Sequence, residues 1–557
     1  PLNSISAHGD INRGLIFFAT AREQLIDGRL PLWQPYMCGG APLWGDIEQW
    51  LFQPLAILTL PFSAPVALKL SYTAALALSF IGFGVLAKTS LRLNTLGAIV
   101  FAFLVSFTAY LSQHLAEGYV VWIGAAWVPW FILFTLKSFT RPAFIPVAGL
   151  MAAWIFGSGT MHLVFYSAMF LTIIAATISY KKRVIHPLTT LALVLLFAVI
   201  LGAVKLLPVL DQLDIQSSRL GLVPSLSLLP DMLLTRKHLP ALEQDGINYR
   251  WSEFANYMGV IPFLLALTGG IMVWTRRKLL PAPSLYGGTL LASLVLLVLV
   301  FTHIPATDGL FASVVDLLRM PSRLMIFPVI GISLLAAYAA QVLWQRTQRI
   351  RWGRTVRLGL GIILLIAAVD LVMYDLQLFS QKFTLPLPAV ARSEQFQRTS
   401  ASYTKKDVLD GKYYKVGYIS YLENMGTNDL CRHYQPDPHT RAFDSSDPLK
   451  PYNGEVWLVN GGKILEYSLK PGILTIAATT STKDRIVLNQ NYDAGWKSTG
   501  DIQPESFNGL VSVPISEGTQ TLVLEYQPQI MWWGAWITVL GSIIAIMWYG
   551  LLRKLIW

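Results

Sequence analysis

Residues 64–87, APVALKLSYTAALALSFIGFGVLA, form an apolar run that holds one charged residue, Lys69. A helix of about 20 apolar residues crosses a bilayer whose hydrocarbon core is roughly 30 Å thick. The chain repeats this pattern about eleven times, near residues 64–87, 94–112, 119–136, 142–158, 162–180, 187–209, 255–274, 285–303, 324–344, 356–375 and 531–552. These runs predict an all-α polytopic transmembrane bundle that ends in a last transmembrane helix.

The composition agrees with a membrane protein. Of the 557 residues, 54% are hydrophobic and 13% are charged, whereas a soluble globular chain carries about 25% charged residues. The net charge of +11 could suggest a nucleic-acid partner. The basic residues, however, gather in alternate short loops, as at Lys88/Arg92, Lys137/Arg141 and Lys181–Arg183, and the loops at 113–118 and 157–161 hold no Lys or Arg. This alternation is the positive-inside pattern, and it argues against nucleic acid.

The same alternation predicts which segments face outward. Basic loops lie in the cytoplasm, so residues 1–50, 113–118, 157–161, 210–253, 304–323 and 376–530 are expected outside. The chain begins without Met and in a polar outer segment, so we expect one preceding span and about twelve in the full protein. The expected location is a bacterial cytoplasmic (inner) membrane, crossed many times, with the large soluble part extracytoplasmic.

The apolar pattern stops at residue 376 and returns at Met531. Short alternating runs with Gly, Pro, Asn and Asp between them predict an antiparallel β-sandwich, with strands near 455–459, 464–469, 473–479, 485–490 and 521–526. The expected domains are a transmembrane domain at 1–375 that includes a long first outer loop (1–62), a β-sandwich-like domain at 376–530, and a C-terminal helix at 531–557.

The first outer loop holds prolines and a cysteine. Pro54, Pro61 and Pro65 interrupt an apolar stretch, which predicts a surface or re-entrant helix before the first full span. Cys38 and Cys431 are both expected outside, where a disulfide is permitted. A bridge between them and two separate thiols remain alternatives.

Three carboxylates in the first outer loop are candidates for catalysis: Asp10, Asp46 and Glu48. A carboxylate here could take a proton from an acceptor hydroxyl, or could hold a divalent cation with a partner. The alternative for each is a solvated loop acid.

Polar residues at the ends of spans often face a cavity rather than lipid. His114 and Glu117 lie in the short outer loop, and His162 begins the next span; snorkelling to the interface is the alternative. Lys205, near the outer end of a span, opposes the positive-inside trend and suits a phosphate partner. The alternative is a lysine reaching lipid headgroups.

Arginines at another outer mouth suggest an anion clamp. Arg319 and Arg323 flank Met320-Pro321-Ser322, and arginine makes bidentate contacts to phosphate. A salt bridge to Asp308 or Asp316 is the alternative. Weaker candidates are Arg219 for anion binding and Glu253, near Tyr257, for a polar pocket.

The sequence has no Walker loop, no CxxC pair and no HExxH motif, so ATP-driven, redox and zinc-protease functions lack support.

The ordered set of short motifs resembles the YfhO-like bacterial membrane proteins of the GT-C superfamily of polytopic glycosyltransferases. The matching stretches run through nearly the whole chain: Gly9-Asp10, Gly28–Trp33, Gly39–Leu43, Leu207-Pro208, Ser217–Arg219, Trp251–Phe254, Tyr257–Gly259, Arg319–Arg323 and Tyr492–Lys497.

This resemblance implies a GT-C-like fold and a function. Enzymes of the superfamily take a sugar from a polyprenyl-phosphate carrier and keep a carboxylate in the first outer loop, a role that falls on Asp10. Asp46 and Glu48 are less secure, because the second acidic element varies. Lys205, Arg319, Arg323 and Arg219 would hold the donor phosphate. Some members use a divalent cation such as Mg²⁺ or Mn²⁺ and others use none; Asp10 and Asp46 would be its ligands.

The leading hypothesis is a glycosyltransferase that uses a polyprenyl-phosphate sugar and acts on a glycan, lipid or protein of the cell envelope. A second is a non-catalytic accessory or assembly subunit of a membrane complex. A third is a flippase or transporter of lipid-linked sugars, although we find none of the paired repeats that transporters often show.

Overall fold

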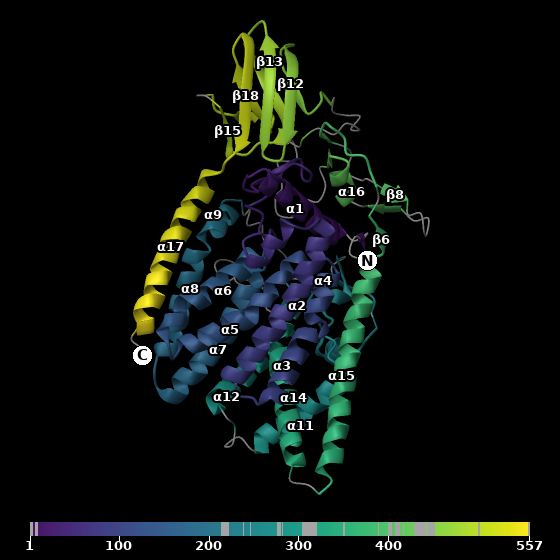
Figure 1. The fold of residues 1–557 in the computed structure, drawn as a ribbon, viewed down its shortest axis with the longest axis vertical. Helices are drawn as coiled ribbons and strands as arrows, with labels where there is room; N and C mark the ends of the chain where they lie inside the picture. The colour runs from purple at the N-terminus through teal and green to yellow at the C-terminus, as the bar shows by residue number, and fades with distance from the viewer. Residues whose placement is uncertain are drawn as a thin grey trace. The chain divides into compact units, whose positions relative to one another are not determined.

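The computed structural model divides into two compact units, coloured along the chain in Figure 1. The β unit comprises Pro1–Ser71, Ala203–Ile215 and Lys382–Thr538, and the helical unit comprises Tyr72–Gly202, Gln216–Gln381 and Val539–Trp557. The structure describes residues 4–554 except 6–8, 213–221, 238, 245–246, 276–279, 281, 303–319, 349–350, 388, 399–403, 407–412, 416, 428–441, 443–451 and 500–501.

Apolar helices make up most of the helical unit. Their bounds are α2 Ala64–Thr89, α3 Thr95–Phe107, α4 Ala109–Ala116, α5 Val128–Ser138, α6 Ile145–Gly157, α7 Met161–Lys182, α8 His186–Leu201, α10 Leu229–Leu234, α11 Val260–Thr275, α12 Pro283–Val300, α14 Ile326–Thr347, α15 Gly353–Lys382 and α17 Gln529–Lys554. The ends of α2 and α17 extend into the β unit. The described 3-10 helices of this unit are η2 Val120–Trp127, η3 Pro142–Phe144, η4 Leu226–Leu228, η5 Trp251–Glu253 and η7 Pro321–Met325. Strands β4 Leu242–Gln244 and β5 Ile247–Tyr249 form a two-stranded antiparallel sheet.

The predicted spans correspond to helices of the structure. Among the described residues, eight helices are long and apolar enough to cross a membrane. The helix pair α8 and α9 (Ala203–Gln212) is apolar enough when taken together but bends by 75° at Gly202, as a broken span or a re-entrant loop does. The two remaining predicted spans are the shorter apolar helices Pro142–Gly157 and Val260–Thr275. The prediction of a multi-pass helical membrane protein is therefore confirmed, with fewer full-length spans than expected.

Helix starts follow local rules. Asn94 caps α3, and its side-chain oxygen accepts the N–H of Gly97 at 2.8 Å. Proline stands in the first turn of α5, α6, α8 and α12, where its missing N–H costs no helical hydrogen bond.

The predicted loop at 113–118 is wrong in one respect. The structure continues the helix through α4 to Ala116, so that Thr95–Ala116 forms one span. His114 therefore lies on a helix and is buried, with 1% of its surface exposed.

Small residues allow close packing around α14. Ala336, Ala337 and Ala340 on this helix are fully buried, and α14 packs against α3, α11 and α12. In membranes such residues let helix backbones approach each other. One close approach is at Gly269 of α11, where an added Cβ would lie 2.0 Å from the carbonyl oxygen of Leu335.

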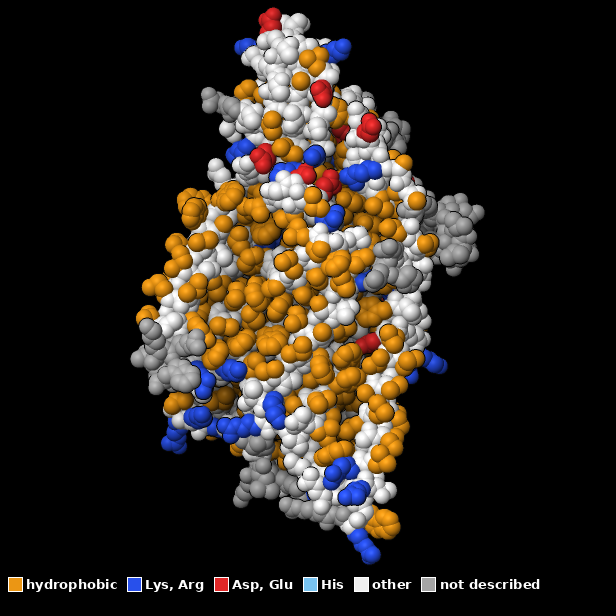
Figure 2. All heavy atoms as spheres, viewed as in Figure 1, with side chains coloured by type: hydrophobic (Ala, Val, Ile, Leu, Met, Phe, Trp, Pro, Cys, Tyr) orange, Lys and Arg blue, Asp and Glu red, His pale blue; other side chains and the backbone are white. Residues whose placement is uncertain are grey.

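Charge is distributed unevenly over the helical unit. Lys88, Lys137, Lys181 and Arg346 lie in the last turns of their helices, and Figure 2 shows Lys and Arg gathered at the lower end of this unit, below a broad hydrophobic surface. Which side of a membrane this end faces, and which membrane it is, stay predictions.

The first 62 residues are more ordered than a loop with short surface helices. They contain α1 (Gly9–Ile26), an 18-residue helix whose Ile11, Leu15 and Phe18 are fully buried. Apolar side chains at this i, i+4, i+7 spacing form one face of a helix. A short 3-10 helix, η1 Pro54–Thr59, follows at the predicted proline-rich position.

The β unit contains two four-stranded antiparallel sheets. One has the order β11 (Val456–Leu458), β14 (Asp484–Asn491), β17 (Leu510–Ile515), β16 (Glu505–Phe507), and the other has the order β12 (Lys463–Lys470), β13 (Ile473–Thr480), β18 (Gly518–Tyr526), β15 (Trp496–Ser498). Residues of both sheets share one apolar core, which includes Ile476, Leu488 and Val513. The β-rich C-terminal region is confirmed. The sequence patterns missed β15, β16 and β17.

Short elements complete the β unit. They are β1 Ser4–Ile5, β2 Trp33–Gln34, β3 Ala41–Pro42, β6 Leu385–Pro386, β7 Gln397–Arg398, β8 Thr404–Lys406, β9 Tyr413–Lys415, α16 Gly417–Leu422 and β10 Met425–Gly426. Their pairs are β1 with β6, β2 with β3, β7 with β10, and β8 with β9.

Trp33 joins the N-terminal segment to the sandwich core. Its ring lies 5.1 Å from that of Trp496 and 4.7 Å from that of Tyr526, and its Nε1 donates to Gln490 Oε1 at 2.5 Å.

Cys38, which follows in the same segment, is disulfide-bonded, which favours the bridge over two separate thiols. Cys431 lies outside the described residues.

Replacing Gly269 with alanine tests the helix packing. Gly269→Ala is expected to destabilise the protein by about 1–3 kcal/mol, because the methyl group would overpack the contact with α14. The measurement is thermal unfolding of the purified protein in lipid. Gly270→Ala is the matched control, because its nearest atom, Leu335 Cδ1, lies 4.0 Å away. Equal unfolding temperatures for the two variants would contradict the packing described.

Candidate functional site

Arg13 links the acidic residues of the N-terminal segment. It lies on α1 one turn after Asp10, which stands in the first turn of that helix. Its Nη2 donates to Asp46 Oδ2 at 2.7 Å, and its Nη1 forms an ion pair with Glu48. The side chain of Arg13 is 7% exposed, whereas those of Asp46 and Glu48 are 11% and 27% exposed. We call Asp10, Arg13, Asp46 and Glu48 the acidic cluster.

The electrostatics of the cluster favour ion pairs. Burial lowers the pKa of the Arg13 guanidinium, but the charges of Asp46 and Glu48, with a smaller contribution from Asp10, raise it above its ordinary value. The guanidinium therefore stays charged in the folded protein.

Hydrogen bonds fix the loop that carries the two acids. Asp46 Oδ1 accepts the N–H of Glu48 at 2.8 Å. Lys205 Nζ donates to the carbonyl oxygens of Trp44 at 2.7 Å and Asp46 at 2.6 Å. Lys205 is fully buried, and a phosphate ligand would have to replace these carbonyl partners. The structure thus shows Lys205 as a tie between α9 and the loop; donor-phosphate binding by Lys205 stays a prediction.

A metal ion does not fit Asp46 as the structure places it. Its Oδ2 is engaged by Arg13 and its Oδ1 by a backbone N–H, so the guanidinium occupies the place between Asp46 and Glu48 that a cation would need. Among the residues that the structure describes, no group of three or more His, Cys, Asp or Glu side chains could hold a metal ion. A Mg²⁺ or Mn²⁺ ion at Asp10 and Asp46 stays an untested prediction.

A second cluster lies within the helical unit. Arg323 of η7 makes a bidentate ion pair with Glu253 of η5, with Nε 2.9 Å from Oε2 and Nη2 2.8 Å from Oε1. His114 Nε2 lies 3.7 Å from the same carboxylate, and its Nδ1 hydrogen-bonds the carbonyl oxygen of Tyr110 at 2.7 Å. We call Glu253, Arg323 and His114 the Glu–Arg–His cluster.

Aromatic rings surround the imidazole of this cluster. The Trp122 ring lies 4.0 Å from that of His114 and 5.1 Å from that of His162. Tyr110 donates its hydroxyl to the carbonyl oxygen of Arg323 at 2.8 Å. His162, predicted for the pocket, therefore packs against Trp122, which in turn packs against His114 of the cluster.

Glu253 is held as a carboxylate. Burial alone would raise its pKa, but the charge and hydrogen bonds of Arg323, together with the nearby imidazole of His114, outweigh that effect and hold the pKa well below its ordinary value.

The other predicted pocket residues have partners outside this cluster. Glu117 is buried and pairs with Arg250 at 3.2 Å. Tyr257 donates to Asp370 Oδ2 at 2.6 Å. Arg219 and Arg319, both predicted to bind phosphate, lie outside the described residues, as do Asp308 and Asp316.

Sequence reasoning missed Arg13 and the pairing of Glu253 with Arg323. A signal for Arg13 existed: Asp10 and Arg13 are three residues apart, which places them on one face of a helix. The signal was lost because residues 1–62 were predicted to be mainly loop. For Glu253 and Arg323, separated by 70 positions, the sequence holds no local signal.

Replacing Arg13 tests its ion pairs with Asp46 and Glu48. Arg13→Met is expected to destabilise the protein by about 3–5 kcal/mol, because Asp46 and Glu48 lose their shared cation. Arg13→Lys should recover part of the loss, since an ammonium lacks the two-armed guanidinium geometry. Thermal unfolding is the measurement, and Arg485→Lys, in the part-exposed pair with Glu505, is the control. Wild-type stability of Arg13→Met would contradict the ion pairs.

Glu253 should make the folded protein less stable as the pH falls into the acidic range. Its folded-state pKa is lowered from 4.5, so its contribution to stability is fully present above about pH 4.5 and is lost as the pH falls below it. The unfolding temperature of wild type should therefore fall more steeply below pH 4.5 than that of Glu253→Gln. Glu243→Gln, an exposed acid of the helical unit, should follow wild type. Parallel curves for wild type and Glu253→Gln would contradict the lowered pKa.

Comparisons with known proteins give a distant similarity. No protein-family model and no curated protein matches the sequence. The cryo-EM structure of the arabinofuranosyltransferase AftD from Mycobacteria has 13% identity and a TM-score of 0.49, over 77% of this chain and 30% of that chain. A structure of a variant of that enzyme gives 13% identity and 0.48, over 77% and 32%. The chain thus spans less than a third of the length of these structures, and TM-scores below 0.5 do not establish a shared fold.

Proposed function

We propose that this protein is a GT-C-type membrane glycosyltransferase that transfers a sugar from a polyprenyl-phosphate donor to a cell-envelope acceptor on the extracytoplasmic side. The observation that carries the proposal is the acidic cluster, in a chain whose described part holds eight helices able to cross a membrane. A donor with a lipid tail suits a membrane-embedded enzyme, and a carboxylate beside the acceptor hydroxyl can take its proton. The YfhO-like resemblance of the motifs agrees with this proposal.

Asp10 is the proposed general base. Asp46 and Glu48 pair with Arg13, so their proposed role is to hold α1 and the loop in position around Asp10. The side chain of Asp10 is half-buried in the first turn of α1, where a carboxylate is favoured by the helix dipole.

The proposed reaction is a single displacement. Asp10 takes the proton of the acceptor hydroxyl, whose oxygen forms a bond to the anomeric carbon of the donor sugar. The bond between that carbon and the phosphate oxygen breaks, and polyprenyl phosphate leaves with the electron pair. A cation that contacts this phosphate stabilises its developing charge.

Of the two described cations predicted to bind phosphate, Arg323 is the more accessible to an anion. Its side chain is 24% exposed, whereas Lys205 is fully buried. Arginine also presents five N–H donors, so one edge of the guanidinium can pair with Glu253 while another N–H contacts an anion.

A non-catalytic subunit of a membrane complex is the second candidate. One observation favours it: the two described cations predicted to bind phosphate, Lys205 and Arg323, have protein partners already. In a scaffold protein such contacts would serve stability alone.

The test measures the rate of sugar transfer by the purified protein in lipid, with a panel of polyprenyl-phosphate sugars as donors and of cell-envelope molecules as acceptors. Wild type is expected to consume donor, and Asp10→Asn should lower the rate by at least about 10²-fold, as expected for loss of a general base. Glu517→Gln, an exposed acid of the β unit, should keep the wild-type rate.

Two other outcomes are informative. Turnover that survives Asp10→Asn and disappears in Asp46→Asn would move the base to Asp46. Folded protein without turnover for any donor would favour the non-catalytic subunit.

A further inference from the structure

A groove on the β unit lies apart from the acidic cluster. It has a volume of about 650 Å³, and its walls include parts of α1, residues 389–392 and α16. Its lining includes Glu23, Val390, Arg392, Tyr418 and Tyr421. Ligand sites typically measure about 300–1,000 Å³ and combine apolar walls with a few polar groups.

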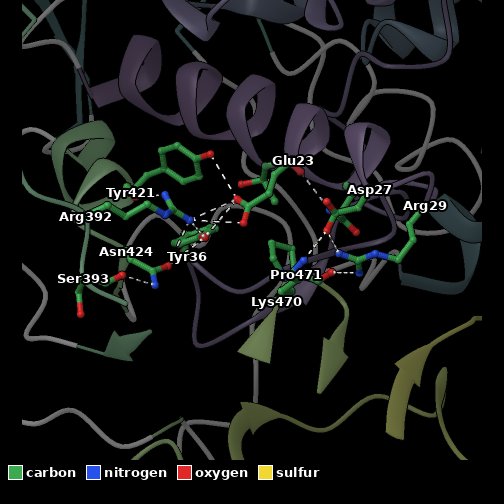
Figure 3. Close-up of polar contacts among 12 residues, drawn as sticks. Glu23, Asp27, Arg29, Tyr36, Arg392, Ser393, Tyr421, Asn424, Lys470 and Pro471 are labelled. Atoms are coloured by element: carbon green, nitrogen blue, oxygen red, sulfur yellow. Dashed lines mark hydrogen bonds and ion pairs between the residues drawn. The ribbon is translucent and has the colours of Figure 1, made fainter. Parts of the chain in front are cut away.

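Glu23 is the centre of the polar groups in this groove. Its carboxylate accepts the hydroxyls of Tyr36 and Tyr421, each at 3.3 Å, and Arg392 Nη2 at 3.3 Å. Figure 3 shows these side chains pointing toward one another beside α1. N–H···O bonds usually measure about 2.9–3.0 Å and O–H···O bonds about 2.7–2.8 Å, so all three contacts to Glu23 are long. Ligand hydroxyls can replace them at small cost.

The groove is only partly filled by these contacts. Arg392 is 41% exposed and Glu23 is 25% exposed. Arg392 also donates to Tyr36 Oη at 2.9 Å and to Asn424 Oδ1 at 3.3 Å. A carboxylate, a guanidinium, an amide and two phenols therefore meet at one place, and together they offer several donors and acceptors.

The tyrosines act as donors at neutral pH. Burial raises the pKa of the Tyr36 hydroxyl, and the Glu23 charge raises it further; the same causes raise the pKa of Tyr421. Both hydroxyls therefore keep their protons.

A second hollow continues the groove toward the sandwich. Asp27 lines both, and the second has a volume of about 440 Å³ between Arg29, Lys470 and Thr475. Asp27 Oδ2 lies 3.1 Å from Arg29 Nη2 and 3.1 Å from Lys470 Nζ. These residues form the right-hand group of Figure 3. The ligand surface is thus elongated, as a chain-like ligand requires.

Five of the six described charged side chains that line this path form ion pairs. Glu23 faces Arg392, and Asp27 faces Arg29 and Lys470. An anionic ligand would have to break these ion pairs, whereas a neutral polyhydroxyl ligand can accept from the cations and donate to the carboxylates at once. The apolar wall at Val390 and Leu422 suits the C–H face of a sugar ring.

We propose that this groove binds a neutral glycan chain, with one sugar hydrogen-bonded by Glu23, Arg392 and Tyr421 and the next sugars extending toward Asp27 and Lys470. If the chain is the acceptor of the transfer, that part of the proposal rests on the proposed function. Binding itself does not depend on turnover.

The test measures binding and turnover separately on the full chain in lipid nanodiscs. The binding probes are maltohexaose, mannohexaose and galactohexaose, measured by saturation-transfer NMR and calorimetry. We expect at least one to bind, and Glu23→Gln to weaken it about 10-fold through loss of charge-assisted hydrogen bonds. Tyr421→Phe, which removes one hydroxyl, should weaken it less.

The control is Glu505→Gln, a carboxylate that pairs with Arg485 elsewhere in the same unit; it should bind as wild type does. Thermal unfolding confirms that each variant is folded. Binding that is unchanged in both Glu23→Gln and Tyr421→Phe would overturn the site, and absence of binding by all three probes would overturn the glycan ligand.

Asp10→Asn separates this proposal from the proposed function. It should bind the oligosaccharide like wild type while losing transfer. Glycan binding in a protein that transfers no sugar would contradict the proposed function alone, and transfer by a protein that binds none of the probes would contradict the groove alone.

Discussion

A buried cation must have charged or hydrogen-bonding partners beside it, and this constraint organises the N-terminal part of the β unit. Arg13 holds Asp46 and Glu48 against α1, although they lie 33 and 35 positions further along the chain. Lys205 satisfies its own buried charge on the carbonyl oxygens of the same loop. An isolated ion is expensive to bury, whereas an ion with paired and hydrogen-bonded partners is tolerated. The loop therefore has one arrangement that satisfies both cations, and Asp10 lies at the start of the helix that this arrangement fixes.

Much of the architecture could be predicted from the sequence, because apolar length and period 2 alternation are local properties. All eleven predicted spans correspond to helices, eight as full-length spans, one as a bent pair and two as shorter helices. The five predicted strands are present as β11, β12, β13, β14 and β18. The missed strands β15 and β16 have three residues each, too few to show alternation, and β17 contains Pro514, which weakens a strand pattern. The helix α1 was missed because its apolar residues are spaced for a soluble-type face rather than a continuous run.

The candidate site was predictable in its residue types and less so in its partners. His114, Glu253 and Arg323 were each selected from their positions at the ends of spans, and the structure brings them together. Their mutual pairing comes from tertiary packing, which leaves no trace in sequence spacing. The same holds for Lys205: its unusual position indicated a compensating partner, but that partner is the protein's own backbone. A lysine on the outer side, against the positive-inside trend, thus predicts an electronegative partner. The sequence does not show whether that partner is a ligand or the chain itself.

The position of Trp33 has a consequence for biosynthesis. Its indole donates to Gln490, 457 positions later, and its ring completes the apolar core around Trp496 and Tyr526. During translation Trp33 leaves the ribosome long before these partners exist, and most of the hydrophobic helices are made in the interval. The side chain of Trp33 therefore cannot enter this core until the last strands are synthesised. Closure of such a distant contact makes assembly of the β unit a late event, so chaperones that shield exposed aromatic segments have their longest opportunity here.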